Sequence, residues 1–118
     1  MTARIGIVGA GLIGRAWAIV FSRAGMSVSL YDVDASALAK AREAIRQSLD
    51  DLQEAGLIED VEAPLSLIQT ESDLARAMAG AEYIQECGPE SVEAKQRIYA
   101  DLEAVTAEDT VLASSTSG

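Results

Sequence analysis

The chain has 118 residues, enough for one domain with a modest hydrophobic core, so we expect residues 1–118 to form a single domain. Apolar residues make up 49% of the sequence, which is typical of a chain that folds, and no apolar run approaches the roughly 18 residues of a membrane span. Nine basic and nineteen acidic residues give a net charge of −10, which argues against a nucleic-acid-binding protein because phosphate contacts need clustered Lys and Arg.

The chain has few of the cysteine and histidine residues that form disulfides or bind metal ions. Cys87 is the single cysteine, so no internal disulfide is expected, and a free cysteine of this kind is typically a small buried apolar residue. The sequence has no histidine, and without a second Cys or His ligand we expect no metal site. The first residues lead directly into a predicted strand and lack the apolar stretch of a signal peptide, so we expect a cytoplasmic protein without a membrane anchor.

The first part of the chain alternates between strand and helix patterns. Arg4–Val8 is a short β-branched run that ends at glycine, which indicates a strand. From residue 12 to residue 24 the apolar side chains recur on one helical face, and Gly25 is placed to end that helix. Residues 27–31 have the composition of a second strand, and Asp32 stands at its end.

A long helix and a weaker strand follow. Asp34 can cap a helix whose apolar residues repeat every three or four positions as far as about Ala55, and Gly56 is placed to stop it. Residues 57–64 have the composition of a connector without regular structure. Residues 65–70 are predicted to form a weak third strand.

The alternation continues to the end of the sequence. Thr70 with Asp73 resembles a capping pair for a short helix that reaches Ala79, where Gly80 would end it. The remaining predicted elements are a strand over residues 81–86, a helix that begins after Ser91 and runs over 92–105, and a strand over 110–114.

Strands that alternate with helices predict parallel strands joined by right-handed crossovers. We therefore expect an α/β fold of the Rossmann type, a doubly wound parallel sheet with five strands in the order 3-2-1-4-5. A full sheet of this type usually has a sixth strand, which we expect to lie beyond the end of this sequence.

The turn GAGLIG at residues 9–14 has the form GxGxxG, and it lies between the first predicted strand and the first predicted helix. Gly9 allows the tight turn, Gly11 lets a pyrophosphate approach the backbone, and Gly14 lets the helix pack closely on the sheet. The helix amino terminus carries a charge of about +0.5, and the N–H groups of Leu12 and Ile13 are predicted to bind a diphosphate there. The alternative is a purely structural turn without a ligand.

Asp32 provides the second element of a dinucleotide site. It follows Gly14 by 18 residues, close to the spacing of about 20 at which an acid binds the adenosine ribose. A carboxylate there accepts both ribose hydroxyls and repels a 2′-phosphate, and neither Arg nor Lys follows it at residues 33–34, so we expect NAD rather than NADP. The alternative is that Asp32 only caps the next helix, for which Asp34 is the better candidate.

Three segments carry a resemblance to a known family: IGIVGAGLIGRAWAIVFSRAGMSVSLYDVD, EYIQECGPESVEAKQRIYADLE and ASSTSG. They resemble the 3-hydroxyacyl-CoA dehydrogenases, and within that family the branch that contains lambda-crystallin (L-gulonate 3-dehydrogenase). The similarity covers essentially the whole chain but only the cofactor domain of the family. It implies an oxidoreductase that transfers a hydride to NAD from the 3-hydroxyl of a 3-hydroxyacyl-CoA or a related 3-hydroxy acid.

The resemblance also assigns roles to residues that the pattern alone would describe as ordinary polar positions. It implies that Glu90 and Lys95 contact the nicotinamide half of NAD; without it, both would be solvated helix charges. Ser117 matches the serine that contacts the substrate oxygen and the nicotinamide, where the pattern alone indicates a polar turn after a strand. Ser115 stands where the family has Asn, as in the lambda-crystallin branch, which argues against a straightforward acyl-CoA substrate.

In the family, a histidine held by a carboxylate takes the proton of the substrate hydroxyl. That pair follows the stretch matching Ser117, and this chain has no histidine. The helical substrate and dimerisation domain of the family also follows that stretch. We therefore expect this chain to bind NAD with little or no dehydrogenase activity by itself, and the full-length protein to be a homodimer that acts on a small 3-hydroxy substrate, which can be a CoA thioester.

The candidate site segments also share one edge of the predicted sheet, whatever the family. The glycine turn, Asp32 and residues 86–90 and 115–117 all follow the carboxyl ends of predicted strands, and in an open parallel sheet that edge is the ligand crevice. Other readings stay open: an L-gulonate or L-carnitine 3-dehydrogenase, and a non-catalytic NAD-binding or structural protein. An FAD-binding domain uses the same turn, but the resemblance beyond Tyr83 disfavours it.

Overall fold

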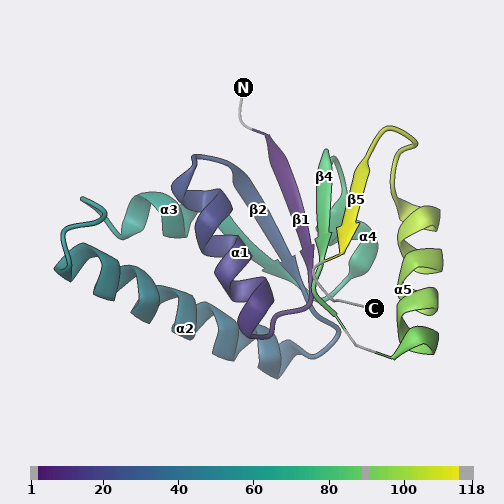
Figure 1. Ribbon diagram of the computed structural model, residues 1–118, viewed down its shortest axis with the longest axis horizontal. Coiled ribbons are helices and arrows are strands. Elements are labelled where there is room, and N and C mark those ends of the chain that lie inside the picture. The colour runs from purple at the N-terminus through teal and green to yellow at the C-terminus, as the bar shows by residue number, and fades with distance from the viewer. Residues whose placement is uncertain (1–2, 89–90, 115–118) are drawn as a thin grey trace.

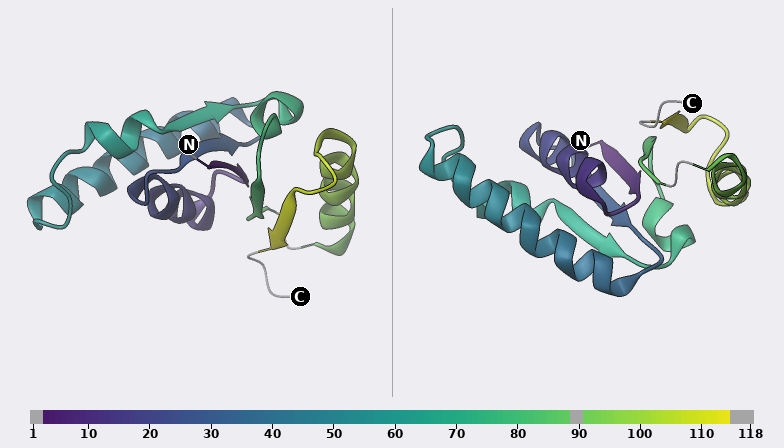
Figure 2. Two further views of the ribbon diagram at one scale, coloured as in Figure 1. Left: turned by 90° about the horizontal axis from the view of Figure 1, so that it is seen from above. Right: turned by 60° about the horizontal axis from the view of Figure 1, so that its bottom comes forward.

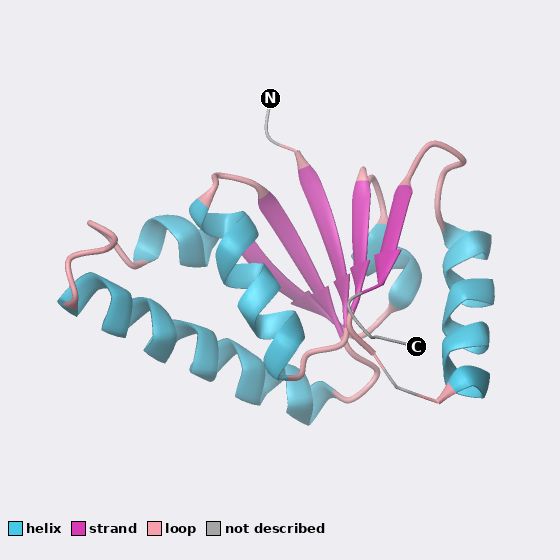
Figure 3. Cartoon of the chain, viewed as in Figure 1, coloured by secondary structure: helices cyan, strands magenta, loops and turns pink. Residues whose placement is uncertain are grey.

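The computed structural model describes residues 3–88 and 91–114, which fold into one parallel sheet covered by helices (Figure 1). All five strands run in the same direction, as the arrows in Figure 3 show. The strands are β1 (Arg4–Val8), β2 (Ser27–Tyr31), β3 (Ile68–Glu71), β4 (Tyr83–Glu86) and β5 (Val111–Ser114). Their order is β3-β2-β1-β4-β5, which confirms the predicted Rossmann topology.

Five helices connect the strands and cover both faces of the sheet. They are α1 (Leu12–Arg23), α2 (Ala35–Glu54), α3 (Glu62–Ser66), α4 (Leu74–Met78) and α5 (Val92–Val105). Side chains of α1, α2 and α3 form one buried cluster with β1, β2 and β3, and side chains of α4 and α5 form a second with β1 and β4. In Figure 2, α5 lies at the β5 end of the molecule, far from α2 and α3 at the β3 end.

The two clusters follow from the alternation of side chains along the strands. Ile5 and Ile7 belong to the cluster under α1, while Val8 belongs to the cluster under α4 and α5. Because all these residues are buried, β1 is covered on both faces, as the central strand of a parallel sheet must be. The end of β1 is thereby fixed in the middle of the sheet, where the glycine turn begins.

The structure differs from the prediction in the connector at residues 57–64 and in the start of the third strand. Residues 62–66 form the short helix α3, and β3 begins at Ile68. Leu65 resembles a strand residue in the sequence, yet it is a buried helix residue in the cluster under α2. Pro64 is compatible with this turn of helix because the first turn needs no N–H donor there, and Asp60 accepts a hydrogen bond from the Glu62 N–H at 3.1 Å as the turn begins.

The predicted Thr70 cap is also wrong, because Thr70 lies within β3, paired with Leu30 of β2. The helix α4 begins later, and Asp73 caps it by accepting a hydrogen bond from the Arg76 N–H at 2.9 Å. The predicted helix ends are confirmed, since Gly25, which follows α1, has a positive φ of 85°. Within the described ranges, none of the helices is long and apolar enough to cross a membrane.

Candidate cofactor site

The turn from β1 into α1 is held in place by contacts that exclude side chains at two glycines. Gly9 has a φ of 106°, and a Cβ there would lie 2.8 Å from the Cys87 carbonyl oxygen. A Cβ on Gly14 would overlap the carbonyl oxygen of Gly9, so the first turn of α1 packs directly on the turn. The Gly9 N–H donates to the Tyr31 carbonyl at 2.8 Å, which ties the turn to the end of β2.

Gly11 differs from the other two glycines, because no chain atom lies within 4 Å of a Cβ built on it. The space over Gly11 is therefore open to a ligand. Gly11 is the N-cap of α1, and within the described ranges no side chain caps this helix and no acid stands in its first turn. The first N–H groups of a helix have no partner within the helix, so those of Leu12 and Ile13 offer donors and a partial positive charge beside this space.

Asp32 is held against the glycine turn by two hydrogen bonds. Its Oδ2 accepts from the Ala10 N–H and its Oδ1 accepts from the Asp34 N–H, both at 3.0 Å. A carboxylate has about four acceptor positions, so these two bonds fix its orientation and leave others for a ligand. Asp34 is the N-cap of α2 and accepts from the Ser36 N–H and hydroxyl, which holds the pKa of the Asp34 carboxyl below its usual value.

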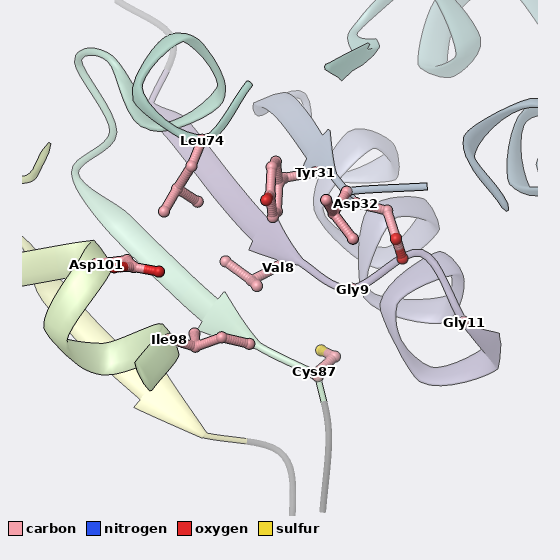
Figure 4. Close-up of a pocket in the computed structure, with 11 residues that line it drawn as sticks. Val8, Gly9, Gly11, Tyr31, Asp32, Leu74, Cys87, Ile98 and Asp101 are labelled. Carbon is pink, nitrogen blue, oxygen red and sulfur yellow. The ribbon is translucent and has the colours of Figure 1, made fainter. Parts of the chain in front are cut away.

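A pocket of about 470 Å³ opens at the carboxyl edge of the sheet, within the usual size range of small-molecule sites (Figure 4). One wall is the turn at Gly9 and Gly11, with Asp32 beside it. The other lining residues come from β1, β2, the loop after β2, α4, the loop after β4 and α5, and they are Val8, Tyr31, Val33, Leu74, Cys87, Gly88, Ile98 and Asp101.

Tyr31 lies in this pocket between two carboxylates. Burial, followed by the negative charges of Asp32, Asp101 and Asp73, raises the pKa of the Tyr31 phenol. The phenol therefore stays protonated at neutral pH and keeps its O–H as a donor. Acidic groups on both sides of the pocket also make it a poor site for an additional phosphate group.

Glu86 is a buried carboxylate at the carboxyl end of β4, with only 1% of its surface exposed. Its Oε1 accepts from the Ser114 hydroxyl at 3.0 Å, and its Oε2 accepts from the Gly88 N–H. These bonds give the buried carboxyl group hydrogen-bond partners and join the turn after β4 to the end of β5. The sequence placed residues 86–90 at the ligand edge of the sheet, but the role of Glu86 in joining β4 to β5 becomes visible only in the structure.

The geometry of turn, acid and pocket agrees with the comparison to known families. Residues 4–118 match the family model described as 3-hydroxyacyl-CoA dehydrogenase, NAD binding domain. The chain belongs to this family. Its cofactor is accordingly NAD, and the open space over Gly11 with the uncapped start of α1 fits the diphosphate of that molecule.

Relatives extend well beyond the length of this chain. The lambda-crystallin homolog of Rattus norvegicus is 40% identical over 114 residues, which are 94% of this chain and 36% of the relative. An L-carnitine dehydrogenase of Streptomyces griseus is 36% identical over 115 residues, which are 98% of this chain and 34% of the relative. The chain thus spans about one third of the length of these relatives.

Solved structures of dehydrogenases share the fold. The 3-hydroxybutyryl-CoA dehydrogenase of Escherichia coli superimposes with a TM-score of 0.92 at 29% identity, over 99% of this chain and 25% of that one. The (S)-3-hydroxybutyryl-CoA dehydrogenase of Ralstonia eutropha gives 0.92 at 25% identity, over 99% and 42%. The Rossmann topology is therefore that of known family members.

The structure brings part of the predicted site together. Gly9, Gly11 and Asp32 share the pocket, whereas Lys95 lies half-buried in the first turns of α5 and is not among the lining residues. Glu90 and Ser117 lie outside the described residues.

Cys87 packs against the core cluster of β1 and α1, but it is only half-buried and also lines the pocket, which corrects the expectation of a buried cysteine. It follows β4 directly at the carboxyl edge of the sheet, where the chain leaves the core for the ligand crevice.

Proposed function

We propose that this chain is the NAD-binding part of an oxidoreductase that oxidises the 3-hydroxyl of a 3-hydroxyacyl-CoA or a related 3-hydroxy acid. The observation that carries the proposal is the open glycine turn with Asp32 fixed beside it, at one end of a single pocket. Family membership supports the reaction class. NAD, when bound, accepts the hydride that leaves the substrate carbon.

The described residues bind and orient the adenosine half of the cofactor. The diphosphate lies over Gly11 at the start of α1, where the N–H groups of Leu12 and Ile13 have no partner within the helix. Asp32 accepts the ribose hydroxyls with its free acceptor positions. The adenine then lies in the pocket beyond the ribose, where apolar side chains favour a flat, poorly hydrated ring.

The nicotinamide half belongs to the carboxyl ends of β4 and β5. Glu90, Lys95 and Ser117 are the residues that we propose there, because the sequence resemblance to the family assigns them that role and the family model covers residues 4–118. Ser117 would also hold the substrate oxygen. In the family a histidine takes the hydroxyl proton and this chain has none, so we propose that this group comes from another segment of the whole protein.

The substrate remains a choice within one class. The L-carnitine dehydrogenase relatives favour a small 3-hydroxy acid, while the likeness to 3-hydroxybutyryl-CoA dehydrogenases favours a CoA thioester and a place in fatty acid metabolism. Ser115 in place of the Asn of acyl-CoA enzymes supports the small acid. An L-gulonate 3-dehydrogenase or a non-catalytic NAD-binding protein, to which the lambda-crystallin relatives point, are the alternatives.

For the whole protein we propose a cytoplasmic homodimer, in which a helical substrate and dimerisation domain accompanies this NAD-binding domain at residues 1–118. The length of the relatives, about three times that of this chain, supports a further domain. The use of NAD, a cofactor of the cell interior, supports the location.

Calorimetric titration of the 118-residue chain with NAD tests the cofactor site directly. We expect saturable binding of one NAD, and competition by ADP-ribose, which carries the diphosphate and ribose but no nicotinamide. The absence of NAD binding would overturn the proposal. A substrate panel with the longer protein, comparing L-carnitine, L-gulonate and 3-hydroxybutyryl-CoA, then decides the substrate, and the absence of turnover with all three favours the non-catalytic alternative.

A further inference from the structure

The cofactor pocket holds a second carboxylate that the proposed function leaves without a role. Asp101 lines the pocket from α5, on the wall across from Asp32. Figure 4 shows the end of its side chain directed into the pocket, toward the space in front of Val8. Within the described part of the chain its carboxylate makes neither a hydrogen bond nor a salt bridge, so it is free to accept from a ligand.

The residues around Asp101 place it where the adenine base of a bound cofactor would extend. Ile98 lies three residues before it on the same face of α5, and with Leu74 from α4 it forms the apolar part of the pocket. Asp32, where the ribose is proposed to bind, lies at the other end, beside the glycine turn. A base attached to that ribose therefore extends along the apolar side chains toward Asp101.

The negative charges of Asp101 and of Asp32, on the opposite wall, both act on the Tyr31 phenol. The phenol lies between the two carboxylates in the pocket. The two carboxylates thus face one common space rather than separate regions of the surface. A ligand that fills this space meets an acceptor at each end.

The chemistry of purines then gives Asp101 a selective role. Adenine presents an exocyclic amino group, which donates hydrogen bonds, whereas hypoxanthine and guanine present a carbonyl oxygen at the same carbon. An ionised carboxylate only accepts hydrogen bonds, so it attracts the amino group and repels the carbonyl oxygen. We propose that Asp101 is a specificity-determining residue that selects the adenine base by accepting a hydrogen bond from its amino group. This inference rests on the proposed NAD site.

The test compares two cofactors that differ only in the base: NAD and nicotinamide hypoxanthine dinucleotide. Both are titrated into the 118-residue chain and into its Asp101→Asn and Asp101→Ala variants, and the ratio of the two dissociation constants is the readout. We expect the unmodified chain to bind NAD roughly three- to tenfold more tightly, the size expected for one partly exposed hydrogen bond to a charged group. In both variants the ratio falls to about one.

Glu103→Gln is the matched control. Glu103 is also an exposed acid on α5 but does not line the pocket, so its substitution removes the same charge and leaves the ratio unchanged. Asp101 is exposed, and the two variants should unfold at the same temperature as the unmodified chain. Two different substitutions keep the test decisive if one of them affects folding.

The outcomes separate the two proposals. NAD binding with an unchanged ratio in both variants overturns the role of Asp101 and leaves the NAD site intact. An equal change in both affinities, with the ratio preserved, also overturns it, because it reveals only long-range repulsion of the diphosphate. Failure of the unmodified chain to bind NAD overturns the proposed function itself.

Discussion

The two halves of the sheet differ in how firmly they are packed. Among the described residues, the cluster around β1, β2 and β3 contains thirteen buried residues and the cluster around β4 and α5 contains five. In the second half α5 buries Leu102 fully and β5 buries none of its four residues. The half that carries the glycine turn and Asp32 therefore has the larger share of the hydrophobic stabilisation.

This difference matches the division of the proposed site. The adenosine half of the cofactor would lie on the well-packed elements, which fix Asp32 and the turn through backbone hydrogen bonds. The proposed nicotinamide half lies on α5 and after β4 and β5, two strands that pair in parallel and whose carboxyl ends are also joined by the polar contacts of Glu86. The adenosine half of the cofactor would thus meet preorganised binding elements, and the proposed nicotinamide half would meet more weakly packed ones.

The largest loss of stability is expected at Gly14, where the well-packed half has no space for a side chain. Gly14→Ala places a Cβ on the Gly9 carbonyl oxygen, which is backbone and cannot move without displacing α1. We expect the free energy of unfolding to fall by about 3 kcal/mol, as in other overpacked sites. Urea denaturation measures it, and an unchanged midpoint would contradict the proposed close contact.

Gly11→Ala is the matched control for this substitution. No atom of the chain lies near a Cβ on Gly11, so the stability should change by less than about 1 kcal/mol. NAD affinity should nonetheless fall at least about tenfold, because the methyl group occupies the proposed diphosphate space. Stability and binding are thus separated between two glycines of one turn.

In the second half, we expect the Glu86 side chain to contribute measurably to the unfolding free energy. Glu86→Leu introduces an apolar side chain of similar size and removes the acceptor of the Gly88 N–H and Ser114 hydroxyl bonds, which should cost about 2 kcal/mol of unfolding free energy. Glu86→Gln can still accept one of these bonds and should cost about half as much. Urea denaturation and hydrogen exchange at β5 measure the effect. If both variants were as stable as the unmodified chain, Glu86 would not stabilise the contact between the ends of β4 and β5.

The sequence predicted the segment from β1 to β2 more completely than the segment between α2 and β4, for a physical reason. β1, α1 and β2 are bounded by glycines and by Asp32, so each end is visible in the local sequence, and β1 and β2 were predicted to the residue. The short helix α3 was missed because its buried Leu65 has no periodic partners over five residues. Local patterns fix elements whose ends carry their own signals.

The far wall of the pocket could not be predicted in this way. Leu74 and Asp101 line the same pocket because α4 and α5 pack together on one face of the sheet, and nothing in either local sequence indicates that packing. The Gly11 turn and Asp32, in contrast, were predicted from spacing alone. Roles for Glu90, Lys95 and Ser117 came only through the family resemblance and stay predictions.

The ribose role of Asp32 gives a smaller, ligand-dependent effect in the well-packed half. Asp32→Ala should weaken NAD binding about tenfold, since one or two charge-assisted hydrogen bonds are lost. NADP binding should change much less, or improve, because the variant no longer repels the 2′-phosphate. Calorimetric titration with both cofactors measures this, with Asp50→Asn, an exposed acid on α2, as the control. Equal losses for NAD and NADP would argue against the ribose role.

The smallest effect uses Cys87 as a reporter at the boundary between the two halves. It is the single cysteine of the chain, it is half-buried, and it lines the pocket beside the glycine turn. A bound dinucleotide covers this wall, so alkylation by a small thiol reagent should slow about twofold when the NAD concentration equals its dissociation constant, and further as the site fills. Mass spectrometry follows the reaction, and Gly11→Ala, which should bind NAD poorly, serves as the control. Equal protection in both chains would mean that NAD shields Cys87 without binding over the glycine turn. That result would contradict the proposal that the turn and the pocket form one cofactor site.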